Sequence, residues 1–275
     1  MTTYIGMLCC HAEAIDPEVT AKAFRVIQSG DPDSPFKYDD TASSRAEITA
    51  ISEKLKLAKV SIVGLGGTGS YVLDFVAKTP VKEIHIFDND MFFQHNVFRS
   101  PGAASEDELN ARPKKVHFHR DRYAPLRDDI VAHDVNIDES NVELLRDSDF
   151  VFLCMDGGKQ KKPIIEKLEE YGIPFIDVGM GVYLTDEKLY SIIRITTSRD
   201  KQRNHAYEKQ RIPFSAGDRD DLYSRNIQVA DLNALNAALA VIKWKKIFGF
   251  YADLEYEHFS TYTIDGNIII NEDQK

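Results

Sequence analysis

Three glycines and one acidic residue form the part of the sequence whose spacing most clearly indicates chemistry. Gly64, Gly66 and Gly69 follow the Gly-x-Gly-x-x-Gly pattern, and Asp88 comes nineteen residues after Gly69. In this pattern the first glycine permits a tight turn, the second lets the backbone approach a phosphate, and the third brings a helix against a strand. Backbone N–H groups at the helix start attract anionic oxygens, and a carboxylate at Asp88 can accept hydrogen bonds from ribose hydroxyls. The spacing therefore predicts a nucleotide site.

The segments around these glycines have the pattern of a strand, a helix and a second strand. Val60–Val63 is a short apolar run, Val72, Phe75 and Val76 follow helical spacing, and Ile84–Phe87 is a second apolar run. Such a βαβ unit would place the turn and the acidic residue at the carboxyl ends of neighbouring parallel strands. The alternative is a glycine-rich turn that serves packing alone.

The composition is that of an ordinary globular protein. The chain has 275 residues, of which 43% are hydrophobic and 28% are charged. No run of eighteen apolar residues is present, and Met1–Cys10 lacks the basic start and apolar core of a signal peptide, so we expect a cytoplasmic protein without a membrane span. The net charge of −10 disfavours sequence-independent binding to nucleic acid, because such binding depends on a basic surface.

The cysteines exclude two kinds of site. Cys9, Cys10 and Cys154 are too few for a disulfide framework, and they form no pair of CxxC motifs that could hold zinc. Cys154 lies in an apolar run, which favours a core position over a nucleophile. His117 and His119 are two residues apart on a predicted helix and would point apart, so they indicate no metal site.

The chain divides into a helical lead-in and an α/β domain. Residues 1–58 form the lead-in, in which Asp16–Gln28 and Thr41–Leu55 are predicted helices separated by a proline- and aspartate-rich loop. Residues 59–275 form the domain, with a nucleotide-binding core over 59–180 and a C-terminal part over 181–275 that carries a polar crossover loop.

Alternating helices and strands continue through the core. The predicted elements are a helix at Pro113–Arg127, a strand at Ile130–Val135, a short helix at Asn141–Arg146, a strand at Phe150–Cys154, a helix at Lys159–Tyr171 and a strand at Pro174–Val178. This alternation predicts a Rossmann-like, doubly wound α/β fold with a mostly parallel sheet and the ligand at the carboxyl ends of the strands.

The last third of the chain predicts a long helix and a β-hairpin. The predicted elements are a strand at Leu189–Thr196, a charged and solvent-covered or mobile loop at Ser198–Asp221, a helix at Ile227–Phe248, and strands at Glu257–Ile264 and Asn267–Asn271. Asp265-Gly266 is the signal of a two-residue hairpin turn between the last two strands. Trp244 lies in the predicted helix, where we expect it to serve packing.

The sequence after Asp88 resembles a particular superfamily of nucleotide-binding proteins. The string DNDMFFQHNVFRSPG is similar to the ThiF/MoeB/ubiquitin-activating superfamily, in which an acidic strand end leads into Asn-x-x-Arg, a lysine and a later aspartate. The resemblance covers about residues 41–196. The positions that match its motifs are Asp88, Asp90, Asn96, Arg99, Lys115 or its neighbour Lys114, and Asp156. An arginine in an N-terminal helix reaches a partner subunit in this family, and Arg45 is the candidate here.

The resemblance implies an ATP-dependent adenylyltransferase that acts on a carboxylate. It implies that Gly64, Gly66, Gly67, Gly69, Asp88, Asp90 and Lys114 bind the nucleotide, and that Asn96, Arg99, Lys115, Asp156 and Arg45 serve catalysis. Attack of a carboxylate on the α-phosphate of ATP builds negative charge, which Arg99 and Lys115 could stabilise. Asp156 could hold Mg²⁺. Each of these residues also has an ordinary structural explanation, as a solvated surface charge or as the cap of a helix.

Three departures from the superfamily pattern limit the expectation. Ser100 follows Arg99 where many members have glutamine, and no cysteine occurs beyond Cys154 to form a thioester. The absence of paired CxxC motifs also argues against the structural zinc of many members. An acyl-adenylate made by this chain would therefore leave by a route other than a thioester on the same chain.

The resemblance implies partners, and alternatives stay open beside it. It implies that the acyl substrate is the C-terminus of a ubiquitin-like protein, a sulfur-carrier protein or a peptide, and that the chain forms a homodimer. The alternatives are an NAD-dependent oxidoreductase with the same βαβ unit, a catalytically silent partner subunit, and a related branch that activates a carboxylate on a modified tRNA nucleoside.

Overall fold

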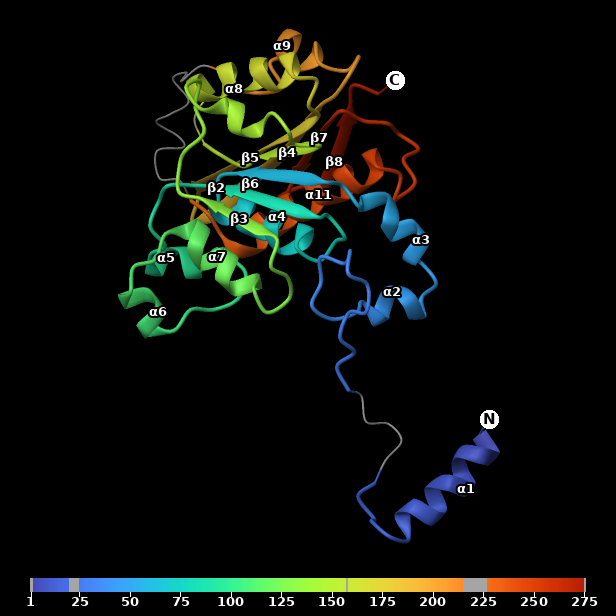
Figure 1. Ribbon diagram of the computed structural model, residues 1–275. Helices are drawn as coiled ribbons and strands as arrows, with labels where there is room; N and C mark the ends of the chain where they lie inside the picture. The colour runs from blue at the N-terminus through green and yellow to red at the C-terminus, as the bar shows by residue number, and fades with distance from the viewer. Residues whose placement is uncertain (1, 20–24, 157, 215–226, 275) are drawn as a thin grey trace.

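The protein is built around one mixed β-sheet of eight strands. The structure is a computed structural model, and it describes all residues except 1, 20–24, 157, 215–226 and 275. The strands lie in the order β3-β2-β1-β4-β5-β6-β7-β8 (Figure 1). The first five in this order pair in parallel, and each of the last three pairs antiparallel to the strand before it.

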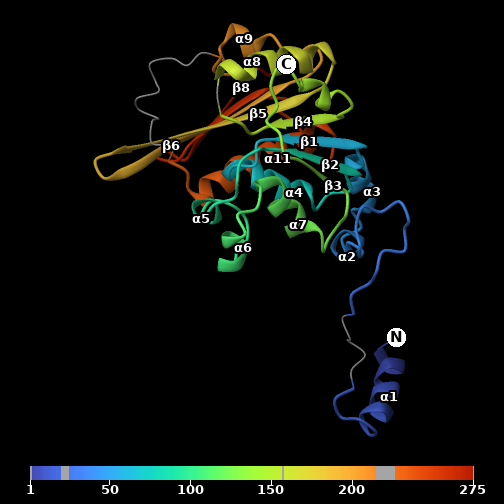
Figure 2. The ribbon, with the colours of Figure 1, turned by 60° about the vertical axis from the view of Figure 1, so that its left-hand side comes forward.

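The predicted strands are all present. They are β1 Lys59–Val63, β2 Glu83–Phe87, β3 Ile130–His133, β4 Phe150–Leu153, β5 Phe175–Thr185, β6 Lys188–Ser198, β7 Phe259–Thr263 and β8 Ile268–Glu272. β5 is longer than its predicted range, because its second half pairs with β6 as a hairpin that extends beyond the sheet (Figure 2). The sheet order and the helices on both faces confirm the predicted Rossmann-like α/β fold.

Helices cover both faces of the sheet (Figures 1 and 2). On one face lie α4 Gly67–Val76, α7 Lys115–Tyr123 and α11 Ala230–Ile247, and on the other lie α8 Gly158–Glu170 and α9 His205–Glu208. Shorter helices are α5 Gln94–Val97, α6 Glu106–Asn110, and the 3₁₀ turns η1 Glu53–Leu55 and η2 Val142–Leu145. Among the described residues no helix is both long and apolar enough to cross a membrane.

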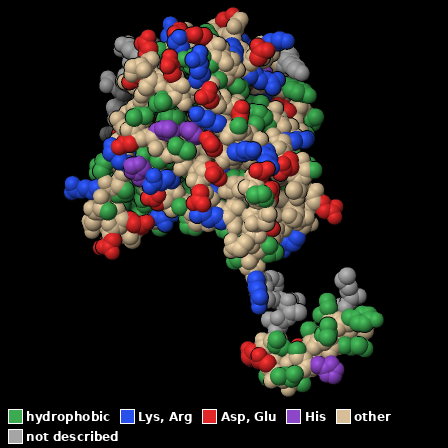
Figure 3. Space-filling view, viewed as in Figure 1, with side chains coloured by type: hydrophobic (Ala, Val, Ile, Leu, Met, Phe, Trp, Pro, Cys, Tyr) green, Lys and Arg blue, Asp and Glu red, His purple; other side chains and the backbone are tan. Residues whose placement is uncertain are grey.

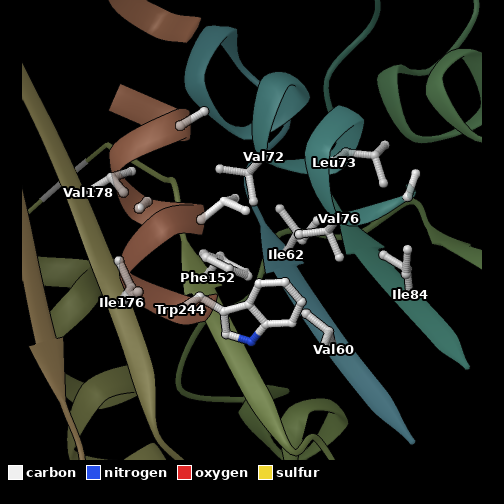
Figure 4. Close-up of a cluster of buried hydrophobic side chains, with 14 of the residues drawn as sticks. Val60, Ile62, Val72, Leu73, Val76, Ile84, Phe152, Ile176, Val178 and Trp244 are labelled. Atoms are coloured by element: carbon white, nitrogen blue, oxygen red, sulfur yellow. The ribbon is translucent and has the colours of Figure 1, made fainter. Parts of the chain in front are cut away.

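The larger of two hydrophobic cores lies between the sheet and the pair α4 and α11. Trp244 of α11 is completely buried there, with its ring within 6.4 Å of the rings of Phe150 and Phe152 on β4 (Figure 4). Val72 and Val76 of α4 complete the same cluster. The prediction that Trp244 serves packing is thereby confirmed. The second core lies on the other face, beneath α8 and α9.

The lead-in differs from the prediction at its first helix. The observed helix is α1, Thr2–Glu13, whereas residues 16–19 and 25–28 of the predicted helix Asp16–Gln28 are not helical. Pro17 disfavours the helical conformation at Asp16, and the Asp16 carboxylate accepts a hydrogen bond from the Glu18 N–H in a local turn. Helical spacing alone therefore gave the wrong boundaries.

The predicted helix Thr41–Leu55 is present as three pieces. These are α2 Thr41–Arg45, α3 Thr49–Ser52 and η1. Asp40 caps α2 by accepting hydrogen bonds from two backbone N–H groups, and Glu47, with a φ of 58°, separates α2 from α3. α1 lies apart from the sheet in both ribbon views, and hydrophobic side chains gather on its surface (Figure 3).

Two features of the C-terminal third also differ from the prediction. The part of Ser198–Asp221 that the structure describes contains α9, and its His205, Ala206 and Ile212 are buried against α8 and the sheet, so it is not a solvent-covered loop. Lys209 and Arg211 of this segment form ion pairs with Glu272, the last residue of β8, and with Asp273 after it, which offsets the cost of partial burial. The loop between β7 and β8 has four residues, 264–267, because Thr263 pairs with Ile268.

His119 of α7 provides a test of the packing around this helix. Its ring lies against the rings of Phe92 and Phe118, and burial lowers its pKa to about 3. The folded protein then keeps His119 neutral, whereas the unfolded chain binds a proton below about pH 6.5. The free energy of unfolding should therefore fall as the pH drops from 6.5 toward 3, by on the order of 1 kcal/mol per pH unit from this group.

The measurement is urea denaturation at pH 7, 6 and 5. His119→Leu should flatten this part of the pH dependence, while His117→Leu, on the same helix but only half buried, should leave it unchanged. Equal slopes for the unmodified chain and His119→Leu would contradict the burial argument.

Candidate functional site

The glycine turn lies at the point where the strand order reverses. β1 pairs with β2 on one side and with β4 on the other, and ligands of open α/β sheets bind at the carboxyl ends of the strands at such a point. Gly64 follows β1 with a φ of 91°, and a Cβ atom there would lie 2.8 Å from the Cys154 carbonyl oxygen after β4. A side chain at Gly69 would lie 1.9 Å from the Gly64 oxygen. Both glycines are thus required for the packing of α4 onto the two strands.

Gly66 is different, because nothing lies within 4 Å of the position that its Cβ would occupy. It is the N-cap residue of α4, and no side chain caps that end of the helix. The N–H groups of the first turn therefore have no side-chain cap at the N-cap position, and uncapped N–H groups of this kind bind phosphate at helix N-termini. This agrees with the role that the sequence predicts for Gly66.

Gly67 is in contact with a helix that the sequence analysis did not connect to the site. A Cβ at Gly67 would lie 2.1 Å from Nδ2 of Asn233 on α11, and Thr68 Oγ1 donates a hydrogen bond to Asn233 Oδ1. Asn236, one turn later, donates to the Gly179 carbonyl oxygen at 3.4 Å. Both asparagines are buried. In the sequence these two residues could have been noticed as two amides three residues apart on an otherwise apolar helix face.

Asp88 is buried and holds the glycine turn in place. Its Oδ2 accepts a hydrogen bond from the Leu65 N–H at 2.8 Å, and its Oδ1 accepts one from the Asp90 N–H at 2.9 Å. Lys115 Nζ lies 2.6 Å from Asp90 Oδ2 and 3.5 Å from Asp88 Oδ2. The structure therefore brings Asp88, Asp90 and Lys115 together beside the turn.

The two adjacent lysines point to different partners. Lys115 is buried in the cluster with Asp88 and Asp90, whereas Lys114 donates to the Asn89 carbonyl oxygen and pairs with Asp134 at 3.1 Å. The backbone arranges this, because the Lys115 N–H donates to the Asp90 carbonyl oxygen and so fixes the direction of each side chain. Of the two candidates, Lys115 is the one that faces the glycine turn.

Asn96 and Arg99 lie on and just after α5. The Oδ1 of the buried Asn96 accepts a hydrogen bond from the Phe93 N–H, so its carbonyl oxygen already serves the start of α5. Arg99 Nε is buried and has no hydrogen-bond partner among the described residues. The pKa of His95 is lowered by desolvation and then by the positive charges of Arg99 and Lys115. This region is thus electropositive and has an unsatisfied donor, which suits an anionic ligand.

Asp156 follows β4 on the other side of the reversal point. Its side chain is exposed, and within the described part of the chain it makes no hydrogen bond or ion pair. No group of three or more His, Cys, Asp or Glu residues in the described chain could hold a metal by itself. Mg²⁺ in nucleotide sites commonly needs only one or two carboxylates, because phosphate oxygens and waters supply the rest. Asp156 fits that requirement.

One predicted site residue, Arg45, is not part of this cluster. Arg45 lies on α2, which precedes the amino end of β1, and its Nε donates to the Thr41 carbonyl oxygen. It is therefore on the opposite edge of the sheet from the glycine turn (Figure 1). Cys154 is half buried, and burial raises the pKa of its thiol, which agrees with a packing role.

These features define the chain as a Rossmann-like nucleotide-binding protein with a cluster of charged residues at the reversal of strand order. The sequence model described as "ThiF family" matches residues 42–196, which is more than half of the chain. The chain therefore belongs to the ThiF family, and by family it is an adenylyltransferase of the E1-like kind. A second model, described as "Domain of unknown function (DUF6791)", matches residues 1–41.

Solved structures agree with the fold. E. coli MccB with MccA-N7isoASN superposes with a TM-score of 0.65 and 21% identity over 86% of this chain and 72% of that one. PaaA superposes with a TM-score of 0.64 and 17% identity over 99% of this chain and 82% of that one. E. coli MccB with ATP superposes with a TM-score of 0.61 and 19% identity over 82% of this chain and 65% of that one. No curated protein matches the sequence.

The glycines yield a matched pair of predictions. Gly69→Ala should destabilise the protein or prevent folding, because its Cβ would collide with the Gly64 carbonyl oxygen. Gly66→Ala should leave the free energy of unfolding within about 0.5 kcal/mol of the original, because its Cβ meets open space. It should nevertheless weaken ATP binding, since the added methyl group occupies the space that a phosphate would approach.

Urea denaturation and calorimetric titration with ATP check both variants. Unchanged ATP affinity in a folded Gly66→Ala protein would show that the phosphates lie elsewhere.

Proposed function

We propose that this protein uses Mg·ATP to adenylate a carboxylate at the C-terminus of a polypeptide. The observation that carries the proposal is the combination of four features. The uncapped N-terminus of α4 and the Asp88–Lys115 pair lie at the glycine turn, Arg99 lies with Lys115 near His95, and Asp156 follows β4. The Nε of Arg99 and the carboxylate of Asp156 have no partner in the described part of the chain. Family membership supports the same reaction class.

In the proposed reaction a substrate carboxylate oxygen attacks the α-phosphorus of ATP, and pyrophosphate leaves. The products are an acyl-adenylate and pyrophosphate, so no other reactant is needed. The α4 N–H groups would hold the phosphates, and Asp88 would accept hydrogen bonds from the ribose with the acceptor sites that Leu65 and Asp90 leave free. Lys115 and Arg99 would stabilise the charge that develops on the α-phosphate. Asn96 would offer a neutral amide beside the incoming carboxylate.

Mg²⁺, when bound with ATP, would neutralise part of the triphosphate charge. Asp156 is the side chain that would hold it, because its carboxylate is exposed at the carboxyl end of β4 and has no partner in the described chain. Asp90 has one oxygen engaged by Lys115 and would orient that lysine.

A polypeptide is the substrate class that the similar structures support. MccB has been crystallised with selenomethionine-containing MccA and with N-formylated MccA, so MccA is a polypeptide. We extend this to the present chain and include ubiquitin-like and sulfur-carrier proteins, whose C-termini are activated in the wider superfamily. The acyl-adenylate would pass to an external nucleophile, because no cysteine follows Cys154 in the sequence.

The first prediction concerns the two lysines. Lys115→Met should lower ATP–pyrophosphate exchange by about 10²–10³-fold, because it removes a positive charge that acts in the transition state. Lys114→Met is the matched control and should have a much smaller effect, since its ammonium group binds Asn89 and Asp134 instead. Circular dichroism would verify that both variants fold, and calorimetry would compare ATP with NAD. Equal losses in the two variants, or binding of NAD in preference to ATP, would refute the assignment.

The second prediction concerns Arg45, which could act only on the site of another subunit. We propose a homodimer in which Arg45 completes the partner's site. Arg45→Ala and Asp156→Ala should each be nearly inactive alone. Mixed after exchange of subunits, they should recover about a quarter of the original exchange activity, because half of the dimers then contain one intact site. Failure to recover any activity, with subunit exchange verified, would place Arg45 outside the site.

A further inference from the structure

A buried ionic cluster lies on the side of β4 away from the glycine turn. Asp177 on β5 is completely buried, and its two carboxylate oxygens bind different cations. Oδ1 accepts a hydrogen bond from Lys161 Nζ at 2.6 Å, and Oδ2 accepts one from Arg194 Nη2 at 2.6 Å. Lys161 is itself buried, so the pair that it forms with Asp177 is not a surface ion pair.

Arg194 fixes the carboxylate of Asp177 from the opposite side. Its guanidinium group lies across Gly179, where a Cβ atom would be 2.6 Å from Nη2. It also donates to Thr196 Oγ1 at 2.6 Å and to the Arg211 carbonyl oxygen at 2.8 Å. Asp177 is therefore held rigidly whether or not Lys161 is present.

The stability of the fold does not require the net charge that this cluster carries. Two cations share one carboxylate, so the cluster carries a surplus positive charge in a buried place. Taking ions out of water is costly, and well-packed apolar side chains often stabilise a fold as well as a buried ion pair does. An Arg194–Asp177 pair would be balanced without Lys161. The burial of Lys161 therefore indicates a role other than stabilising the fold.

Lys161 lies five residues after Asp156, in the first part of α8. Asp156 itself is exposed and has no hydrogen bond or ion pair within the described chain, so only the backbone on either side sets its position. On one side Cys154 N–H donates to the Val63 carbonyl oxygen of β1 at 2.8 Å. On the other side the Lys161–Asp177 bond ties the start of α8 to β5. The start of α8 is also held by Gly158, which lies against the Pro213 carbonyl oxygen, and by the buried Ile164. Loosening the Lys161–Asp177 bond would release the polar contact among these.

We propose that Lys161 is a positioning residue, which through its bond to Asp177 fixes the start of α8 and thereby holds Asp156 at the nucleotide site. The proposal rests on the proposed function, because it concerns the carboxylate that would hold Mg²⁺ with ATP. Lys161 does not touch the nucleotide, and it acts through Asp156 alone.

The experiment is a set of calorimetric titrations of the full chain with ATP, in Mg²⁺ and in EDTA. The quantity measured is the gain in ATP affinity that Mg²⁺ provides. Lys161→Met should reduce this gain by about 10–100-fold, the range for residues that orient a metal ligand, and should leave the affinity in EDTA unchanged. Lys161→Arg keeps an ion pair with Asp177 and should retain part of the gain.

Two further variants make the test specific. Lys162→Met is the matched control, because Lys162 is exposed, has Glu166 as its one ion-pair partner in the described chain, and is adjacent to Lys161 on the same helix. Asp156→Ala should lower the gain at least as much as Lys161→Met does, and Lys161→Met added to Asp156→Ala should lower the remaining gain no further, since both act through one carboxylate. Thermal unfolding verifies folding, and Lys161→Gln replaces Lys161→Met if that protein does not fold.

The outcomes separate the two proposals. Loss of the gain in Asp156→Ala together with an unchanged gain in Lys161→Met would overturn the role of Lys161 and leave the proposed function intact. A further loss when Lys161→Met is added to Asp156→Ala would also overturn it, because Lys161 would then act independently. A normal gain in Asp156→Ala, or no binding of ATP by the unmodified chain, would refute the proposed metal role and the role of Lys161 with it.

Discussion

The close contact between the glycine turn and the end of β4 is the constraint on which the site depends. Gly64 and Gly69 lie so near to each other and to Cys154 that no side chain fits at either position. This contact aligns the start of α4 with the loop that carries Asp156. Nothing lies near the Cβ position of Gly66. Gly64 and Gly69 therefore allow the close packing of α4, while Gly66 leaves space that a phosphate could occupy.

Charged groups on either side of that contact are arranged in different ways. Asp88 uses its oxygens to hold the backbone of the turn and lies against Lys115, so the residue that would bind the ribose also shapes the pocket. Asp177 instead joins α8, β5 and β6 through two cations, away from any open surface. Between them Arg99 and Asp156 keep groups without partners in the described chain, one a donor and one an acceptor. Ion-paired side chains are thus found together with unpaired groups, which also include Asn233 Nδ2 and Asn236 Oδ1, and unpaired groups of this kind are available to a polar ligand.

Much of the architecture could be predicted because its signals are local. The strands of the core are short apolar runs and α11 has a wide apolar face, so burial requires a layered sheet with helices on it. The predictions were wrong where the spacing of residues within one segment did not determine its structure. Asp16–Gln28 has helical spacing, yet residues 16–19 form a turn at Pro17 and residues 25–28 are not helical, while residues 20–24 lie outside the described chain. The charged segment after β6 is partly buried, because ion pairs with the chain beyond β8 compensate its charges.

The sequence by itself determined the glycine turn, the polar residues that follow each strand, and the membership of the ThiF family. These features depend on residues that are close together in the chain. Only the tertiary structure decided which of two adjacent lysines faces the turn, because the answer depends on a hydrogen bond between residues 90 and 115. The same holds for Asn233 beside Gly67 and for Lys161 on Asp177. These contacts join segments between sixteen and 166 residues apart, and the spacing within one segment carries no information about the side chain that another segment brings to it.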